Sequence, residues 1–171
     1  MKKIAFIGLM FLSIALQARV QNDPRALIIY QFTKLIDWPA GTKNGMFRIG
    51  VLGSLAGYKD LSDVTMGRNV GSQNIEVMNV MSISQLKLAT FHILLVGDDF
   101  CTPEKMAVIN EQLKGKATLV VAQKVNYTGT GICIGFEEIG QRYKYTYKTS
   151  SIESKGLKCS QDFLLMGKKS E

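Results

Sequence analysis

The side chains that most often catalyse reactions or bind metal ions are sparse in this sequence. His92 is its only histidine, and Asp98 and Cys101 follow shortly after it. Because a strand rises about 3.3 Å per residue, His92 and Asp98 would lie at opposite ends of one strand, too far apart to share an ion. No Gly-x-Ser-x-Gly or similar nucleophile motif accompanies the histidine. We therefore expect no catalytic residue, no metal site and no cofactor, and a histidine whose hydrogen bonds are satisfied inside the fold.

A glycine-rich stretch, Gly50-Val-Leu-Gly53-Ser-Leu-Ala-Gly57, follows a strand-like run. Glycine turns in such places can let phosphate approach backbone amides. The spacing differs from Gly-x-Gly-x-x-Gly, and the Gly-Lys-Ser/Thr ending of a P-loop is missing. An ordinary turn from a strand into a helix is the favoured interpretation. A small-molecule cleft near Gly53 and Gly57 is kept as the alternative.

Basic residues and tyrosines alternate in Arg142-Tyr-Lys-Tyr-Thr-Tyr-Lys148. Such a mixture can bind single-stranded nucleic acid when rings and bases share one surface. In a strand, however, Tyr143, Tyr145 and Tyr147 would point to one face and most of the basic side chains to the other. We expect the tyrosines to pack on the core and the basic face to be solvated, with no nucleic acid bound.

Three cysteines, Cys101, Cys133 and Cys159, could form one disulfide and leave one thiol over. None belongs to a Cys-x-x-Cys pair, so the sequence does not support a thioredoxin-like site. Cys133 lies in an apolar run, which is typical of a small buried hydrophobe. A Cys133–Cys159 bond is one candidate pairing, although spacing alone does not establish it. We expect any disulfide to be dispensable for folding.

The start of the chain is typical of a secretory signal peptide. Two early lysines precede an apolar stretch from Ile4 to Leu16, and Ala18 is the best small residue for cleavage. The stretch is shorter than the ~20 residues of a membrane span. We expect residues 1–18 to be a signal peptide cleaved near Ala18, with the mature protein in the periplasm. An uncleaved membrane anchor is the alternative.

The expected mature chain, residues 19–171, has the length of one domain and can bury a core of its own. Cleavage would leave 19 basic residues against 14 acidic ones. This modest excess is spread along the chain, so it favours solubility or an acidic partner and does not indicate nucleic acid. There is no internal repeat, low-complexity tract or linker, which predicts a single domain.

Capping residues and periodicity predict the elements around these features. A buried helix should begin at Asp23-Pro24 and end before Pro39. Four strands are predicted, over residues 47–52, 74–80, 91–96 and 118–122. A helix that begins at Thr102-Pro103 separates the last two strands, so they should be parallel neighbours.

The end of the chain changes character. Residues 131–137 and 143–147 should form an antiparallel hairpin around Gly140. Ser150 and Glu153 could form a capping box for a short helix, and a last helix is predicted over 162–166. The predicted fold class is α/β: a single-domain three-layer sandwich whose mixed sheet has a parallel core and an antiparallel C-terminal hairpin, flanked by helices.

Five segments stand out by their order along the chain. They are Ala26-Leu-Ile-Ile-Tyr-Gln-Phe-Thr-Lys-Leu-Ile-Asp-Trp-Pro39, Phe47-Arg-Ile-Gly-Val-Leu-Gly53, His92-Ile-Leu-Leu-Val96, Gly131-Ile-Cys-Ile-Gly-Phe136 and Ser154-Lys-Gly-Leu-Lys-Cys-Ser-Gln-Asp-Phe-Leu-Leu165. The first two are the most specific. In this order, and over nearly all of the mature chain, the segments resemble the YfiR-like family of periplasmic regulators.

The resemblance implies a regulatory binding protein and not an enzyme. The best-known relatives bind the periplasmic part of an inner-membrane diguanylate cyclase and repress it, so cyclic-di-GMP signalling and biofilm formation depend on their release. Relatives form dimers and can be controlled by the redox state of their disulfides, although they often carry Cys where this chain has Phe91. The expected partner is the periplasmic domain of an inner-membrane cyclase or sensor kinase, and a homodimer is expected too.

Four residues are candidates for contacts with that partner. Trp38 and Pro39 leave the first helix at a turn, where an aromatic anchor could be exposed, although Trp38 could equally fill the core. Leu157 comes from the Gly156-Leu157 segment of the resemblance, and Arg142 from the basic strand. The alternative function is a periplasmic small-molecule-binding protein, and a hydrolase is the least favoured.

Overall fold

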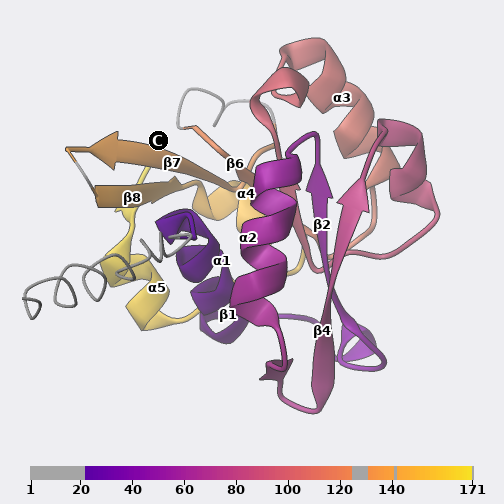
Figure 1. Cartoon of the computed structure of the whole chain (residues 1–171), viewed down its shortest axis with the longest axis horizontal. Coiled ribbons are helices and arrows are strands. Elements are labelled where there is room, and N and C mark those ends of the chain that lie inside the picture. Colours follow the sequence, from indigo (N-terminus) through magenta and orange to yellow (C-terminus); the bar gives the residue numbers. More distant parts are fainter. Residues whose placement is uncertain (1–21, 125–130, 141, 171) are drawn as a thin grey trace, which may run out of the picture.

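A mixed sheet with helices on both faces forms the body of the protein (Figure 1). The computed structural model describes residues 22–124, 131–140 and 142–170, so the predicted signal peptide lies outside the described residues. Within them, eight strands form one sheet in the order β10-β8-β7-β6-β5-β2-β4-β3. The predicted single-domain, three-layer α/β sandwich is confirmed.

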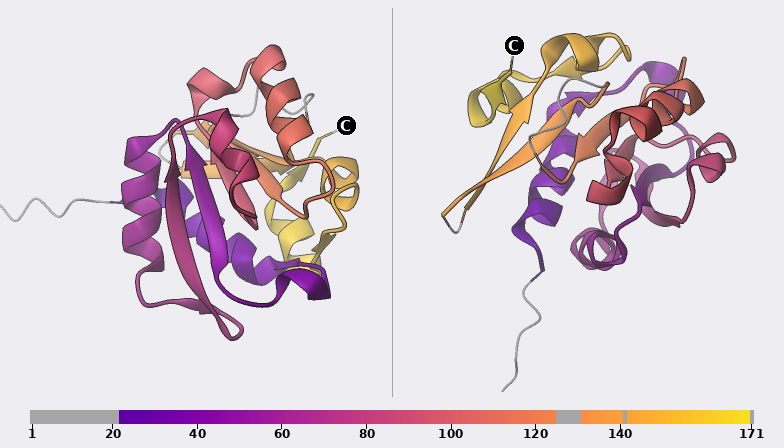
Figure 2. Two further views of the ribbon diagram at one scale, coloured as in Figure 1. Left: turned by 90° about the vertical axis from the view of Figure 1, so that its right-hand side faces the viewer. Right: turned by 90° about the horizontal axis from the view of Figure 1, so that it is seen from above.

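The centre of the sheet is parallel. Its strands are β2 (Phe47–Leu52), β4 (Gln73–Val80), β5 (Ile93–Val96) and β6 (Leu119–Ala122). Helix α2 (Leu55–Thr65) connects β2 to β4, and α3 (Pro103–Gln112) connects β5 to β6. The two connections run in opposite directions across the sheet, so right-handed crossovers place α2 and α3 on opposite faces (Figure 2). The strand order therefore reverses between β2 and β5.

Helix α1 (Pro24–Leu35) begins as its sequence predicts. The Asp23 side chain accepts the Arg25 backbone N–H at 2.9 Å, and Pro24 occupies the first turn, where a proline loses no helical hydrogen bond. The helix buries Phe32 completely. Its ring packs against Phe136, Tyr145 and Phe163, with centroids 5.0–6.4 Å apart. This aromatic cluster joins α1 to the C-terminal half of the chain.

The C-terminal half adds the antiparallel hairpin. Strand β7 (Ile134–Ile139) is parallel to β6 and antiparallel to β8 (Arg142–Tyr147), and Gly140 turns with φ +66°. Helix α5 (Gln161–Met166) leads into β10 (Lys168–Lys169), which extends the sheet beside β8. Tyr145 and Tyr147 are buried and contact Phe163 of α5. The tyrosine face of β8 thus packs on the core, as predicted.

Two short strands form a separate ladder. Strand β1 (Ile36–Asp37) follows α1 directly and pairs with β9 (Lys158–Cys159) in antiparallel register. The Ser160 N–H also donates to the Leu35 carbonyl at 2.9 Å. This pairing brings the segment after α1 next to a segment more than a hundred residues later.

The remaining elements are short, and two of them differ from the prediction. They are β3 (Asn69–Val70), α4 (Thr149–Glu153) and the 3-10 helices η1 (Ala40–Thr42), η2 (Ile83–Lys87) and η3 (Asp98–Phe100). From the sequence, Ser82 or Ser84 could cap a short helix through Ala89; in the structure this segment is the 3-10 helix η2, which ends at Lys87. The predicted capping box is wrong, because Ser150 lies inside α4. The Lys148 N–H donates to the Cys133 carbonyl at 2.9 Å, so strand pairing fixes where the helix starts.

No helix within the described ranges has both the length and the apolar character that a membrane crossing requires.

Candidate functional site

The glycine-rich turn lies at the carboxyl ends of β2 and β5, where the strand order reverses. Proteins with this kind of sheet often bind ligands at such a point. Here the space is filled: a Cβ built on Gly53, which has φ +74°, would lie 2.4 Å from the Phe100 ring. Ser54 caps α2 by accepting the Gly57 N–H at 3.1 Å, and the Gln123 side-chain amide donates to the same hydroxyl at 3.0 Å. The stretch is an ordinary strand-to-helix turn.

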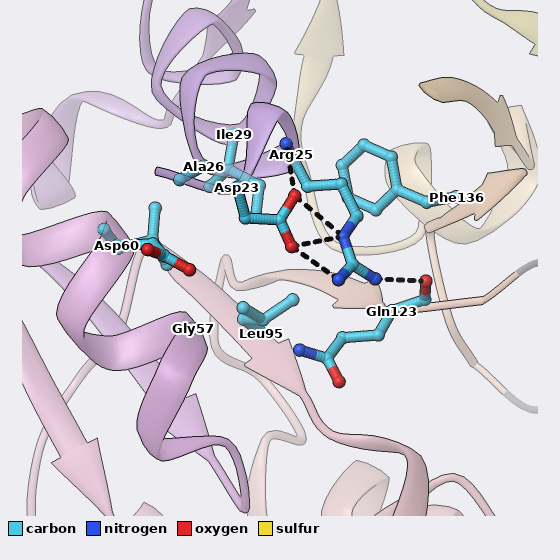
Figure 3. A pocket seen from close by; sticks show the side chains of 10 residues that line it. Asp23, Arg25, Ala26, Ile29, Gly57, Asp60, Leu95, Gln123 and Phe136 are labelled. Carbon is cyan, nitrogen blue, oxygen red and sulfur yellow. Dashed lines mark hydrogen bonds and ion pairs between the residues drawn. The ribbon is translucent and has the colours of Figure 1, made fainter. Parts of the chain in front are cut away.

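Arg25 ties the start of α1 to this end of the sheet (Figure 3). Its guanidinium binds both carboxylate oxygens of Asp23 and donates to the Gln123 carbonyl at 3.2 Å. It also lies 4.9 Å from the ring centroid of Tyr143 in β8. Burial would raise the pKa of Asp23, but the hydrogen bonds from Arg25 outweigh it and hold that pKa below its usual value. The Arg25 guanidinium therefore links the start of α1 to the segment after β6 and to β8.

The pocket at Gly57 is too small for a metabolite. It lies between Arg25, Ala26, Gly57, Leu95 and Phe136, and its volume of about 10 Å³ has room for roughly one water molecule. Small-molecule sites usually exceed ~300 Å³. The cleft that the sequence suggested near Gly53 and Gly57 is therefore closed, because Phe100 and the Arg25 ion pair occupy it.

His92 lies at the opposite, amino-terminal end of the parallel strands. Its ring is 5% exposed and stacks on Phe47 at 4.2 Å. The Arg48 backbone N–H donates to Nδ1 at 3.1 Å, so Nε2 carries the proton and donates to the Thr42 carbonyl at 2.8 Å. Both nitrogens are thus used in holding the 40–45 loop against β2. The histidine is satisfied inside the fold, as the sequence predicted.

We expect the free energy of unfolding to decrease as the pH is lowered from neutral to mildly acidic, because of His92. Burial lowers the pKa of His92 below 6.5, the Thr42 hydrogen bond opposes this, and the Arg48 charge adds to it. The unfolded chain then binds more protons than the folded one. The contribution of neutral His92 to the free energy of unfolding is therefore fully present above pH 6.5, and it is lost as the pH falls toward the folded-state pKa. The decline should reach at most about 1.4 kcal/mol per pH unit. Urea denaturation at a series of pH values measures it.

The chain itself supplies the control for this titration. His92 is the only histidine in the sequence, so no second imidazole titrates in that range. A His92→Asn variant should be less stable overall but should lack the decline between pH 7.5 and 5.5. An unchanged decline in that variant would assign the effect to other groups.

Trp38 belongs to the core and is not an exposed anchor. Its side chain is 4% exposed, packs edge-on against Phe47 at 5.0 Å and donates its indole N–H to the His92 carbonyl at 3.3 Å. These contacts place the indole between the first residue of β2 and the residue that precedes β5. Of the two readings that the sequence allowed for Trp38, the structure shows the buried one.

The other partner-binding candidates are separated by the fold. Leu157 is 1% exposed, so neither it nor Trp38 can contact a partner without a change in packing. Pro39 is half-buried and lies beside Gly156, whose added Cβ would be 3.7 Å from the Pro39 ring. Arg142 is exposed and pairs with Ile139 beside the turn of the β7–β8 hairpin. These four residues do not form one surface, and contacts by Pro39 or Arg142 stay a prediction.

The cysteines are free thiols in the structure. Burial raises the pKa of Cys133 to about 11, and burial together with the neighbouring Cys133 raises the pKa of Cys159 to about 11. Such thiols are largely protonated at neutral pH and react slowly. The Cys133–Cys159 disulfide therefore stays a prediction.

A cation cluster at the junction of α1 and α2 was not anticipated. The Lys34 ammonium lies 4.8 Å from the ring centroid of Tyr30, and the Arg68 guanidinium 4.5 Å from it. The four-residue spacing of Tyr30 and Lys34 on a helix is a signal the sequence contains. The approach of Arg68 depends on how α2 packs against α1, which the sequence does not reveal. We call these three residues the Tyr30 cluster.

A groove runs beside the Tyr30 cluster. It has a volume of about 270 Å³, and its lining includes Thr33, Trp38, Lys43, Val70 and Gln73. The Lys43 ammonium is paired with Asp37 at 2.6 Å on one rim. Two of the lining residues are close to the cluster in the chain: Thr33 is adjacent to Lys34 in α1, and Val70 follows Arg68 by two residues.

Comparison with known proteins identifies relatives for this fold. The sequence model of a family described as YfiR/HmsC-like matches residues 22–168. Among solved structures, a conserved domain protein from Vibrio cholerae O1 biovar eltor is similar, with a TM-score of 0.54, 9% sequence identity and coverage of 86% of this chain. This chain spans only 60% of that protein's solved chain, and the low identity restricts the likeness to the fold. No protein with curated annotation matches the sequence.

Proposed function

This chain belongs to the YfiR/HmsC-like family, and from that membership we propose that it binds the periplasmic part of an inner-membrane signalling protein and represses or modulates its activity. Members of the family are known as periplasmic regulators of diguanylate cyclases. The observation that carries the proposal is the match over residues 22–168, which includes every helix and nearly every strand of the described fold. A diguanylate cyclase is the first candidate partner and a sensor kinase the second.

A binding role agrees with the way the fold uses its reactive groups. Both nitrogens of His92 hold backbone atoms, and the cysteine thiols have pKa values raised by burial. Among the described residues, no group of three His, Cys, Asp or Glu could hold a metal ion. We propose that the protein has no catalytic activity and acts through contact alone. The predicted cleavage near Ala18 would deliver the domain to the periplasm, and association into a homodimer is part of the same proposal.

Repression by contact needs only a modest interface. A regulator must bind the inactive state of its partner more tightly than the active state, and a tenfold preference corresponds to about 1.4 kcal/mol. A patch of ~800 Å² on each partner is the usual size of a specific interface. The domain is large enough to present such a patch on any of its faces.

Deletion of the gene should change cyclic-di-GMP levels several-fold, and export of the protein should be required to restore them. The measurement is mass spectrometry of cyclic-di-GMP in the parent, the deletion strain and two complemented strains. One complemented strain carries the full chain, and the other lacks residues 2–18, so its protein stays in the cytoplasm. Only the full chain should restore the parental level.

Each other outcome has a definite meaning. Unchanged cyclic-di-GMP together with a changed phosphorelay output would replace the cyclase by a sensor kinase as the partner. Complementation by the chain without residues 2–18 would refute a periplasmic role. If no signalling output changes, the regulatory function itself is contradicted.

A further inference from the structure

The Tyr30 cluster gathers two cations around one tyrosine ring. Tyr30 is 6% exposed, while Lys34 and Arg68 are both exposed to solvent. Lys34 lies one turn after Tyr30 in α1, and Arg68 comes from the turn between α2 and β3. Both cations lie over the Tyr30 ring, and both lower the pKa of its hydroxyl. A surface point with two positive charges and a hydroxyl suits an anion.

The positive charge of the cluster is not balanced within the fold. In the part of the chain that the structure describes, ion pairs with carboxylates involve Arg25, Lys43, Arg48, Lys114 and Lys124, and neither Lys34 nor Arg68. Burial alone would raise the pKa of Tyr30, but hydrogen bonds and charge from Lys34 and Arg68 outweigh it and lower the pKa. No carboxylate contributes to that balance. Two like charges beside one ring repel each other, and a bound anion would relieve the repulsion.

Hydrogen bonds fix the backbone segments that carry Tyr30 and Arg68. The Arg68 N–H donates to the Thr65 carbonyl at 3.0 Å, and its carbonyl accepts the Ile75 N–H of β4 at 3.3 Å. Tyr30 is fixed in the middle of α1, where its carbonyl accepts the Thr33 hydroxyl at 2.7 Å. A preformed site loses less conformational entropy on binding, which favours affinity.

The adjoining groove indicates what kind of anion would fit. Its lining runs from Thr33 and Val70, which lie one and two positions from Lys34 and Arg68 in the chain, to Trp38 and Phe47. The Asp37 carboxylate also lines it and is paired with Lys43. Its volume of about 270 Å³ exceeds that of a single carboxylate and suits one or two side chains of a peptide. The two parts together match an extended segment whose acidic residues meet the cluster and whose neighbouring residues enter the groove.

We propose that the Tyr30 cluster is the docking point for an acidic, extended segment of the membrane partner, with carboxylates bound between Lys34 and Arg68. This inference rests on the proposed function, because it assigns the surface and the chemistry through which that partner is held. The Tyr30 hydroxyl positions both cations and offers a further hydrogen bond to the carboxylate.

The binding test uses the mature protein and a defined probe, a fluorescein-labelled peptide of twelve glutamates, followed by fluorescence anisotropy at low salt. Lys34→Gln with Arg68→Gln should weaken binding about tenfold, the size expected for two ion pairs. The matched control is Lys87→Gln with Lys105→Gln, which removes the same charge from η2 and α3 on the opposite face. Lys105 also lies over an aromatic ring, that of Phe100, at 5.1 Å. The control should weaken binding about twofold or less, since it changes only the long-range field.

Equal losses in both double variants would show attraction by net charge alone and would overturn the inference. Tyr30→Phe provides a second variant that keeps the ring and removes the hydroxyl, so folding should be retained. It should weaken binding by less than the double variant, about threefold. Unchanged binding after removal of Lys34 and Arg68 would overturn the inference as well.

The same variants in the cell separate this inference from the proposed function. The deletion strain is complemented with the chain carrying Lys34→Glu and Arg68→Glu, or with Lys87→Glu and Lys105→Glu, at equal periplasmic levels. Regulation should be lost only with the first pair. If both pairs regulate normally, the docking point is refuted while the proposed function stands. If the unaltered chain does not regulate either, the proposed function fails independently of the peptide result.

Discussion

Replacement of Trp38 by alanine is expected to lower the free energy of unfolding by about 3–5 kcal/mol, as for other large aromatic side chains deleted from a core. The indole is 4% exposed, packs against Phe47 and donates to the His92 carbonyl at 3.3 Å. Its removal leaves a cavity beneath the loop after α1 and removes one of the two hydrogen bonds that the His92 carbonyl accepts, the other coming from the Leu119 N–H at 2.8 Å. Urea denaturation followed by circular dichroism at 222 nm gives the change directly.

A loss of regulation in Trp38→Ala would therefore reflect instability and not a missing contact. Trp38→Phe is the matched control, because it keeps most of the ring volume and removes only the N–H donor. It should cost about 1–2 kcal/mol. An unchanged unfolding midpoint in Trp38→Ala would mean that the indole is exposed in solution. Trp38 would then again be a candidate for direct contact with the partner.

Replacement of Gly97 by alanine should destabilise the protein by about 3 kcal/mol, at the upper end of the usual cost of overpacking. An added Cβ would lie 2.6 Å from the Gly53 carbonyl oxygen and 3.1 Å from that of Leu52. The Gly97 N–H donates to the Leu52 carbonyl at 2.8 Å. The two backbone segments are thus hydrogen-bonded to each other, and moving them apart to make room for a Cβ would break this bond. Differential scanning calorimetry should show a clear decrease in the melting temperature.

Gly41→Ala is the control for this substitution. An added Cβ at Gly41 meets nothing within 4 Å, and its φ is not positive. The change should be neutral within about 0.5 kcal/mol or slightly stabilising. If Gly97→Ala is equally neutral, the carboxyl ends of β2 and β5 are looser than described, and a ligand cleft at that point would have to be reconsidered.

Local signals in the sequence predicted the elements well. The Asp23-Pro24 start of α1 and the bounds of β2 follow from capping and strand formers that act over a few residues. The helix between β5 and β6 implied parallel neighbours, because a right-handed crossover is nearly obligatory. Where a long-range bond competes, as the Lys148 bond to Cys133 does at the start of α4, the local rule failed.

The sequence by itself determined the α/β class, the family resemblance and the absence of a recognisable catalytic motif, since these depend on composition and on patterns along the chain. Only the tertiary structure decided the strand order, the β1–β9 pairing and the burial of Trp38 and Leu157. It alone brought Arg68 to Tyr30 and Arg25 to the Gln123 carbonyl. These contacts join residues far apart in the chain. Their free energies depend on how helices pack against the sheet, a property that no local pattern encodes.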